Sequence, residues 1–195
     1  RVLEPIATGG MARVYRAIQP PLDRAVAIKV LRRVERNPDE LARLRREAEA
    51  LAAIRHPNVV QVLDYDVQDG QPFLVMELID GASLHDLLLS GMQPLPIGLL
   101  ARVGVEVLQA VDAIHQAGVV HRDLKPGNLL ISRSGRVVGA DFGIALRVGD
   151  AQAVPTQYLA GTAGFMAPEL GLRGQASRAS DLYAVGVLLY QLATG

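Results

Sequence analysis

The stretch that decides the fold of this chain is His121-Arg122-Asp123-Leu124-Lys125-Pro126-Gly127-Asn128. It follows a segment with apolar residues at helical spacing and precedes a short apolar run, which predicts a loop between a helix and a strand. A second motif, Asp141-Phe142-Gly143, comes just after the next predicted strand. An acid, an amine and an amide thus gather in one loop. This points to a functional site, because such sites are commonly carried on loops.

The side chains of this loop are those that phosphoryl transfer from ATP requires. The carboxylate of Asp123 can orient an attacking hydroxyl and accept its proton, and the ammonium group of Lys125 can neutralise charge on the moving phosphate. The amide oxygen of Asn128 and the carboxylate of Asp141 suit Mg²⁺, which prefers oxygen ligands. Gly143 leaves the backbone free to turn sharply. Because both motifs occur at the right interval, an accidental match is improbable.

The composition indicates a globular domain without disulfide bonds. The chain has 195 residues, 50% of them apolar, and a formal net charge of +0, which gives no sign of general attraction to nucleic acid or membrane surfaces. There is no cysteine, and His85 and His115 have no partners at metal-ligand spacing, so we expect no zinc site. The longest apolar run, 184–189, is far short of a membrane span. The chain begins at Arg1 and not at Met, so we expect it to be part of a longer protein.

Local patterns predict a mostly-β first part. β-branched residues and turn signals predict strands at 12–18, 25–31, 59–65 and 72–78. A helix is expected to begin after Asn37, which is a candidate N-cap. Its expected buried side consists of Leu41, Leu44, Ala48 and Leu51. The joint with the second part is expected near residues 77–82.

The second part is predicted to be mostly helical. A helix with an apolar face over residues 100–114 is expected to end at Gly118. Two short strands are expected at 129–131 and 136–138. The segment 141–169 is long for a connection in a compact domain unless it is functional. The run 181–194 is apolar on nearly every side, which predicts a fully buried helix.

Two features of the first part make weaker cases for function. The small residues of Ala7-Thr8-Gly9-Gly10 would let backbone N–H groups approach a phosphate, although a plain glycine turn explains them equally well. Lys29 lies near the end of an apolar strand, where a buried ammonium needs an anionic partner, and Glu47 could supply it. The alternative is that Lys29 and Glu47 are ordinary solvated side chains.

Together these motifs resemble the signature set of protein kinases. The resemblance extends over the whole chain and includes Lys29, Glu47, residues 121–128, Asp141-Phe142-Gly143 and Met166-Ala167-Pro168-Glu169. The chain looks most like bacterial Ser/Thr kinases of the eukaryotic (Hanks) type. The resemblance implies an α+β bilobal fold, with a small antiparallel β lobe and one helix at residues 1–79. Residues 80–195 would form a partial, mostly helical lobe that stops after the central buried helix.

The resemblance implies a role for each matching residue. The catalytic residues would be Asp123 as the base, Lys125 at the γ-phosphate, Lys29 at the α- and β-phosphates and Glu47 as the ionic partner of Lys29. ATP would be bound by Ala7, Gly9, Gly10, Val14, Ala27, Lys29, Met76, Glu77, Ile79, Asn128, Leu130 and Asp141. Within this set, Met76 would be the gatekeeper, and the backbone of Glu77 and Ile79 would hydrogen-bond the adenine. Mg²⁺ would be held by Asn128 and Asp141.

The resemblance also suggests a regulatory switch. Arg122 would pair with a phosphate on the segment after Asp141, and Thr156 best matches the autophosphorylation position. The alternative for Thr156 is a solvated loop threonine. Thr162 would help to shape the Ser/Thr substrate site. The implied partners are ATP and proteins with Ser or Thr, with no nucleic acid and no membrane segment in this stretch, and self-association during autophosphorylation is a further option. The domain is expected in the cytoplasm, on a parent chain that could be membrane-anchored elsewhere.

The sequence departs from the family pattern in two places. Ala7 and Ala12 replace two of the glycines of the phosphate loop, from which we expect weaker ATP binding. The chain stops at Gly195, just after the helix at 181–194, which would leave an apolar face exposed. We therefore expect either an excerpt from a longer product or a truncated one.

Three other functions remain open on the sequence alone. A pseudokinase would bind nucleotide or act as a scaffold, but it usually lacks at least one of the catalytic residues, all of which are present here. An inactive truncated fragment is the second alternative. A small-molecule kinase is the third, and the segment ending in Met166-Ala167-Pro168-Glu169 disfavours it.

Overall fold

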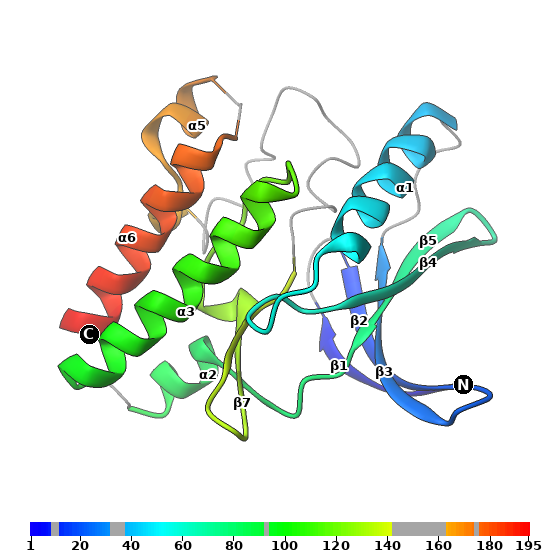
Figure 1. Ribbon diagram of the computed structural model, residues 1–195, viewed down its shortest axis with the longest axis horizontal. Coiled ribbons are helices and arrows are strands. Elements are labelled where there is room, and N and C mark those ends of the chain that lie inside the picture. Colours follow the sequence, from blue (N-terminus) through cyan, green and yellow to red (C-terminus); the bar gives the residue numbers. More distant parts are fainter. Residues whose placement is uncertain (9–11, 32–37, 92–93, 142–162, 174–175) are drawn as a thin grey trace.

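The first part of the chain, in a computed structural model, is a five-stranded antiparallel sheet with one helix packed against it (Figure 1). The structure describes residues 1–8, 12–31, 38–91, 94–141, 163–173 and 176–195. The strands are β1 (Val2–Thr8), β2 (Ala12–Gln19), β3 (Arg24–Leu31), β4 (Val62–Gln68) and β5 (Gln71–Glu77), and the helix is α1 (Pro38–Ala53). The order across the sheet is β1-β2-β3-β5-β4, so β3 lies inside and β4 forms an edge.

Helix α1 is held against the sheet by the apolar stripe that its sequence predicts. Leu44, Ala48 and Leu51 are 2%, 1% and 1% exposed, which confirms three positions of the predicted buried side. They share one core cluster with Leu31 of β3 and Leu74 of β5. The fourth, Leu41, is only partly buried and packs against the same cluster. Because burying one leucine side chain contributes about 1.5–3 kcal/mol, this stripe fixes the position of α1 on the sheet.

The second part is mostly helical. Its helices are α2 (Leu84–Leu89), α3 (Ile97–Gln116), α5 (Pro168–Arg173) and α6 (Arg178–Thr194), with 3-10 turns at Pro126–Asn128 and Ala163–Phe165. A small sheet contains β6 (Gly81–Ser83), β7 (Leu129–Ser132) and β8 (Val137–Gly139). Helices α3 and α6 lie side by side, and their buried Val107 and Leu188 belong to one core cluster (Figure 1). No helix in the described ranges is both long and apolar enough to cross a membrane.

Two strands differ from the sequence-based prediction. Strand β1 was not predicted, because all 7 of its residues are exposed and so give no alternation of buried and exposed positions. Strand β4 begins at Val62 and not at residue 59. The reason is that Val59 forms a parallel bridge with Gly139, whose carbonyl also accepts the N–H of Val60 at 2.9 Å. These two valines therefore pair with β8 and not with β5.

The helix ends are close to those predicted, but α6 is not fully buried. Gly118 follows α3 with a φ of 74°, a conformation that glycine adopts without strain. On α6, Leu188 is 0% exposed, whereas Leu182 and Tyr190 are 51% and 70% exposed. The expectation of a fully buried helix was therefore wrong for this chain, in which one face of α6 is open. Asn37, the predicted N-cap of α1, lies outside the described residues.

The connection at residues 54–61 ties the first part to the second. The side chain of Asn58 is buried and donates from Nδ2 to the carbonyl of Val137 at 2.7 Å and to Oε2 of Glu106 at 3.1 Å. The N–H of Gly139 donates to the carbonyl of Asn58 at 2.8 Å. Because buried polar groups must be paired, these bonds fix the end of α1 relative to α3 and β8.

Candidate active site

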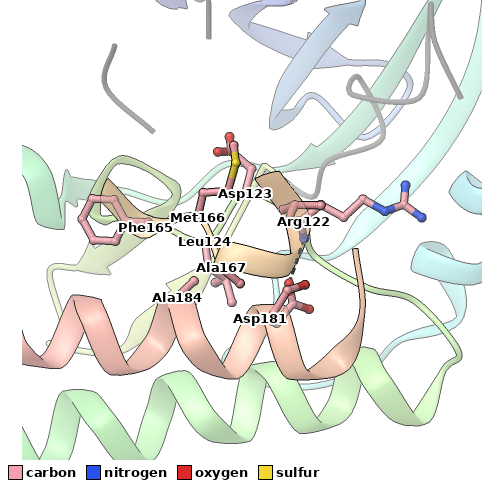
Figure 2. A pocket seen from close by; sticks show the side chains of 10 residues that line it. Arg122, Asp123, Leu124, Phe165, Met166, Ala167, Asp181 and Ala184 are labelled. Atoms are coloured by element: carbon pink, nitrogen blue, oxygen red, sulfur yellow. Dashed lines mark hydrogen bonds between the residues drawn. The ribbon is translucent and has the colours of Figure 1, made fainter. Parts of the chain in front are cut away.

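The loop at residues 121–128 is anchored by Asp181 in the first turn of α6. This carboxylate is 2% exposed and accepts the N–H of His121 at 2.8 Å and the N–H of Arg122 at 2.9 Å. Figure 2 shows Asp181 on α6 with a bond to the backbone at Arg122. The Nε2 atom of His115 donates to the same carboxylate at 2.8 Å. Three donors thus replace the water that a carboxylate loses on burial, and the loop is held just before Asp123.

Two residues of the site have a left-handed backbone conformation. The φ angles are 72° at Arg122 and 61° at Asp141. A residue with a Cβ atom adopts this conformation at a cost of roughly 1–2 kcal/mol. Such strain persists only where the surroundings enforce it, and at Arg122 the bond from its N–H to Asp181 is one such constraint.

The three polar side chains that the sequence groups in this loop are in direct contact. The Nζ atom of Lys125 lies 2.8 Å from Oδ2 and 3.0 Å from Oδ1 of Asp123. The Nδ2 atom of Asn128 donates to Oδ2 of Asp123 at 2.9 Å and to its carbonyl oxygen at 2.6 Å. Because the amide nitrogen of Asn128 faces Asp123, its amide oxygen points to the opposite side.

Lys29 on β3 reaches the same site from the other part of the chain. Its side chain is 5% exposed and forms an ion pair and a hydrogen bond with Asp141. The N–H of Ala140 donates to the carbonyl of Asn128 at 2.8 Å, which keeps Asp141 next to the loop. Lys29, Asn128 and Asp141, which lie far apart in the sequence, are therefore brought together.

The structure differs from the sequence-based expectation for Lys29. Among the described residues, Lys29 forms no ion pair with Glu47. Lys29 pairs with Asp141, whereas Oε1 of Glu47 lies 3.7 Å from Nη1 of Arg122. Both side chains of the second pair are largely buried, at 16% and 18% exposed. The left-handed backbone at Asp141 turns its carboxylate toward β3, and Arg122 is directed toward α1.

His121 is a neutral, fully buried part of the loop. Burial lowers its pKa, and the nearby carboxylates of Asp181, Asp123 and Asp141 only partly oppose that effect. Its Nε2 atom donates to the carbonyl of Ala140 at 3.2 Å. The ring of His121 therefore links the loop to Ala140, the residue before Asp141.

The residues expected around an adenine lie on neighbouring strands and share one apolar cluster. Ala27 on β3 pairs with Met76 on β5, and Val14 on β2 pairs with Lys29. Val14, Ala27, Met76 and Ile79 belong to, or pack against, the core cluster that also contacts Ala140.

The other residues expected to bind ATP lie on several different elements. The N–H of Glu77 already donates to the carbonyl of Gln61 at 2.9 Å. The backbone group of Glu77 that could bond an adenine is therefore its own carbonyl oxygen. Leu130 lies on β7 between Ser83 and Val138. Ala7 pairs with Val14 near the end of β1. The remaining expected site residues, Gly9, Gly10, Thr156 and Thr162, lie outside the described residues.

A small pocket with a volume of about 20 Å³ lies beside Asp123 (Figure 2). Its walls come from the loop, from residues 165–167 and from α5 and α6, and the apolar ones include Leu124, Phe165, Met166 and Leu170. Met166 and Asp123 both line this pocket (Figure 2). Apolar surface is therefore present at the place where the sequence predicts the attack on a phosphate.

The donor set of the site fits Mg²⁺ better than a transition metal. Among the described residues, no group of three or more His, Cys, Asp or Glu side chains could hold a metal ion. Asn128 and Asp141 offer one amide oxygen and one carboxylate. This suits Mg²⁺, which typically takes one or two carboxylates, several waters and the phosphates of a substrate.

Sequence reasoning did not assign a role to Asp181, His115, Asn58 or Glu106. A carboxylate at the start of a helix that is otherwise apolar was the available signal for Asp181, because a buried charge needs a purpose and partners. His115 has no local partner, and the residue that it contacts lies 66 positions away. No local pattern marks Asn58 or Glu106.

Comparison with known proteins shows which family the chain belongs to. The chain matches the family model for the protein kinase domain over residues 1–195. It is 44% identical over 191 residues to the serine/threonine-protein kinase PknL of Mycobacterium tuberculosis, covering 97% of this chain and 48% of that protein. It is 41% identical over 205 residues to the serine/threonine-protein kinase pkn3 of Myxococcus xanthus, covering 100% of this chain and 37% of that protein. The chain thus spans less than half the length of these two relatives.

The fold comparison points the same way. The structure resembles the crystal structure of the PknI kinase domain of Mycobacterium tuberculosis with a TM-score of 0.76 and 29% identity, covering 98% of this chain and 72% of that one. That likeness includes the antiparallel sheet with its helix and the helical part that follows. The chain belongs to the protein kinase domain family, of the kind found in bacterial Ser/Thr kinases.

Proposed function

We propose that this chain catalyses transfer of the γ-phosphoryl group of ATP to serine or threonine hydroxyls of proteins. The observation that carries this proposal is the contact of Asp123 with both Lys125 and Asn128, on a loop whose backbone is bonded to Asp181. A carboxylate fixed in this way can hold a hydroxyl at a set distance from the phosphate, which is the main contribution a protein makes to phosphoryl transfer.

Each charged side chain has a defined task in this mechanism. The carboxylate of Asp123 accepts a hydrogen bond from the substrate hydroxyl and takes its proton. Lys125 neutralises charge on the moving phosphate, and Lys29 binds the α- and β-phosphates. Asn128 and Asp141 would hold Mg²⁺, which supplies charge neutralisation at the phosphates.

The adenine would lie between Val14 and Ala27 on one side and Leu130 on the other. The backbone of Glu77 and Ile79 would bond it, with Met76 at the back of the pocket; Ala7, Gly9 and Gly10 would line the phosphates. In this proposal residues 1–79 act as one lobe and residues 80–195 as the other.

Two further proposals, on regulation and location, rest on the resemblance to bacterial Ser/Thr kinases. We propose that phosphorylation at Thr156 draws Arg122 toward the new phosphate, and that Thr162 shapes the acceptor site. We also propose that the domain works in the cytoplasm, where ATP and protein substrates meet.

The test is transfer of radiolabelled phosphate from ATP to a generic protein substrate, with wild type and Asp123→Asn compared. Loss of the general base should lower the rate by about 10²–10⁴-fold. Asp23→Asn is the matched control, because it makes the same change at an exposed turn remote from the site. Equal incorporation by wild type and Asp123→Asn would rule out the proposed role. ATP binding without any transfer by wild type would favour the pseudokinase alternative instead.

A further inference from the structure

The backbone at Gly81 lies closer to strand β7 than any side chain would allow. Gly81 pairs with Ser132 between β6 and β7. A Cβ atom added at Gly81 would lie 2.0 Å from the carbonyl oxygen of Ile131 and 2.9 Å from the Cα atom of Ser132. Both are backbone atoms, so no side chain could move aside. The φ of Gly81 is not in the left-handed region, so this position needs glycine for space and not for conformation.

The residue before Gly81 is held on the same strand. The N–H of Arg133 donates to the carbonyl of Asp80 at 3.0 Å, and Nε of Arg133 lies 2.9 Å from Oδ2 of Asp80. The side chains of Arg133 and Asp80 are 82% and 76% exposed, so their ion pair contributes little. The backbone bond and the close fit of Gly81 are therefore the main ties between this segment and β7.

The residue before Asp80 has backbone groups that a ligand can use. The N–H and the carbonyl of Ile79 form no hydrogen bond in the described part of the chain. Ile79 is partly buried and packs against the core cluster that contains Ala27 and Met76. Backbone groups that are not paired within a protein are bonded by water or by a ligand. The N–H and the carbonyl of Ile79 are thus available to the base of a nucleotide.

Strand β7 also continues directly from the catalytic loop. Its first residue, Leu129, is 0% exposed and follows Asn128, whose Nδ2 atom donates to Asp123. Because Gly81 rests on this strand, its close fit sets the position of Ile79 relative to Asn128. The groups available to a base and the groups expected at the phosphates are therefore connected through β7.

We propose that Gly81 is a positioning residue that makes nucleotide binding specific for adenine. This inference rests on the proposed function, in which the backbone of Ile79 bonds the adenine. Adenine carries a donor at N6 where guanine carries an acceptor at O6, so a backbone carbonyl held in place bonds adenine and repels guanine. In Gly81→Ala, β6 must move away from β7, and Ile79 moves with it. Lys29 and Asp141 do not lie on β6, so phosphate binding should remain.

The test is isothermal titration calorimetry of the whole chain with the magnesium complexes of ATP, GTP and inorganic triphosphate. Wild type is compared with Gly81→Ala and with Gly98→Ala. Gly98→Ala is the matched control, because Gly98 is exposed at the start of α3 and a Cβ atom there would meet nothing within 4 Å. Lys29→Met serves as the converse variant, because it removes a group expected at the phosphates and leaves β6 unchanged.

We expect Gly98→Ala to bind all three ligands as wild type does. Gly81→Ala should weaken ATP binding by about tenfold, as for the loss of one or two hydrogen bonds, and the preference for ATP over GTP should fall by the same factor. Its Kd for inorganic triphosphate should not change. Lys29→Met should weaken all three ligands and keep the preference for ATP. A merely structural role of Gly81 would instead weaken all three ligands alike.

Hydrogen exchange on wild type gives a second readout that needs no variant and so does not depend on the folding of Gly81→Ala. Adenosine should slow exchange at the amides of Ile79 and Arg133, because the base and the contact between β6 and β7 hold the same segment. Inorganic triphosphate should slow neither.

Three results would overturn the inference. These are an unchanged Kd of Gly81→Ala for ATP, an equal loss of ATP and triphosphate binding in that variant, and exchange at Arg133 that adenosine leaves unchanged. If wild type transfers phosphate to a protein and gives any of these results, the proposed function stands without this inference. If wild type binds none of the three ligands, the proposed function fails as well.

Discussion

The Nη1 atom of Arg122 lies 3.7 Å from Oε1 of Glu47, so the residue that precedes the proposed base is joined to helix α1. Lys29, which was expected to pair with Glu47, is instead paired with Asp141. Lys29 and Asp141, both expected to take part in ATP binding, therefore form an ion pair with each other. Nucleotide binding must compete with this pair, because Lys29 cannot give its full charge to a phosphate and to Asp141 at once.

Lys29 should be needed for nucleotide binding, whereas Asp123 should not. Mg-ATP at about 100 times its Kd should stabilise wild type by about 2.7 kcal/mol. For Lys29→Met we expect at least a tenfold weaker Kd, which removes about 1.4 kcal/mol of that gain. Asp123→Asn should keep the full gain although its rate of phosphate transfer falls by about 10²–10⁴-fold. Thermal unfolding with and without Mg-ATP measures both, and an equal shift in wild type and Lys29→Met would contradict the role of Lys29.

Asp181 should hold the catalytic loop in place. Asp181→Asn puts an amide where three donors converge, so at least one of the N–H groups of His121, Arg122 and His115 loses its acceptor. We expect a loss of about 1–3 kcal/mol in the free energy of unfolding and a lower rate of phosphate transfer. Urea unfolding and initial rates provide the readouts. Asp112→Asn is the control, because Asp112 is exposed on α3 and bonds only Gln116 in the described contacts. A wild-type rate in Asp181→Asn would show that this anchor does not position Asp123.

The sequence predicts the catalytic cluster because its members are local. Asp123, Lys125 and Asn128 lie within one loop, so their contact needs no knowledge of the fold. The buried stripe of α1 was also predictable, because its spacing follows directly from the period of a helix.

Contacts between distant segments were not predictable in the same way. Both Glu47 and Asp141 are plausible anionic partners for Lys29, and residue spacing does not rank carboxylates that lie on different elements. The choice depends on the backbone at Asp141, whose left-handed φ of 61° no local pattern indicates. Asp181 contacts residues 59 and 60 positions away, and only the packing of α6 against the loop reveals that role.

The stability of the chain should depend on the protonation of His121. Burial lowers its pKa below 6.5, so the unfolded chain binds more protons than the folded chain between the folded pKa and 6.5. The free energy of unfolding should therefore fall as the pH falls through this window, by at most about 1.4 kcal/mol per pH unit. His121→Phe should remove this slope, whatever its effect on absolute stability. The exposed His85→Asn should keep the slope. Urea midpoints across about pH 5–8 test this, and an unchanged slope in His121→Phe would contradict it.

Glu106 should stabilise the joint between the two parts through its ionised form. Burial acts to raise the pKa of Glu106. The hydrogen bond from the N–H of Val137 at 2.7 Å, together with those from Arg102 and Asn58, lowers it by more. The pKa of Glu106 therefore lies below its ordinary 4.5. A carboxylate whose pKa is lower when folded contributes stability above pH 4.5, and that contribution is lost as the pH falls through the folded pKa. Glu106→Gln should therefore lower the free energy of unfolding by about 1–3 kcal/mol near neutral pH.

The chain contains a matched control for this prediction. Glu49 on α1 pairs with Arg45 at 2.9 Å, as Glu106 pairs with Arg102, and both pairs have the same spacing along a helix. The two glutamates differ in exposure, at 61% for Glu49 and 16% for Glu106. Because exposed ion pairs contribute only about 0–1 kcal/mol, Glu49→Gln should change stability little at any pH. Urea unfolding of both variants at neutral and acidic pH compares them. If Glu106→Gln were no more destabilising than Glu49→Gln at neutral pH, the bonds to Val137 and Asn58 would contribute nothing to the joint.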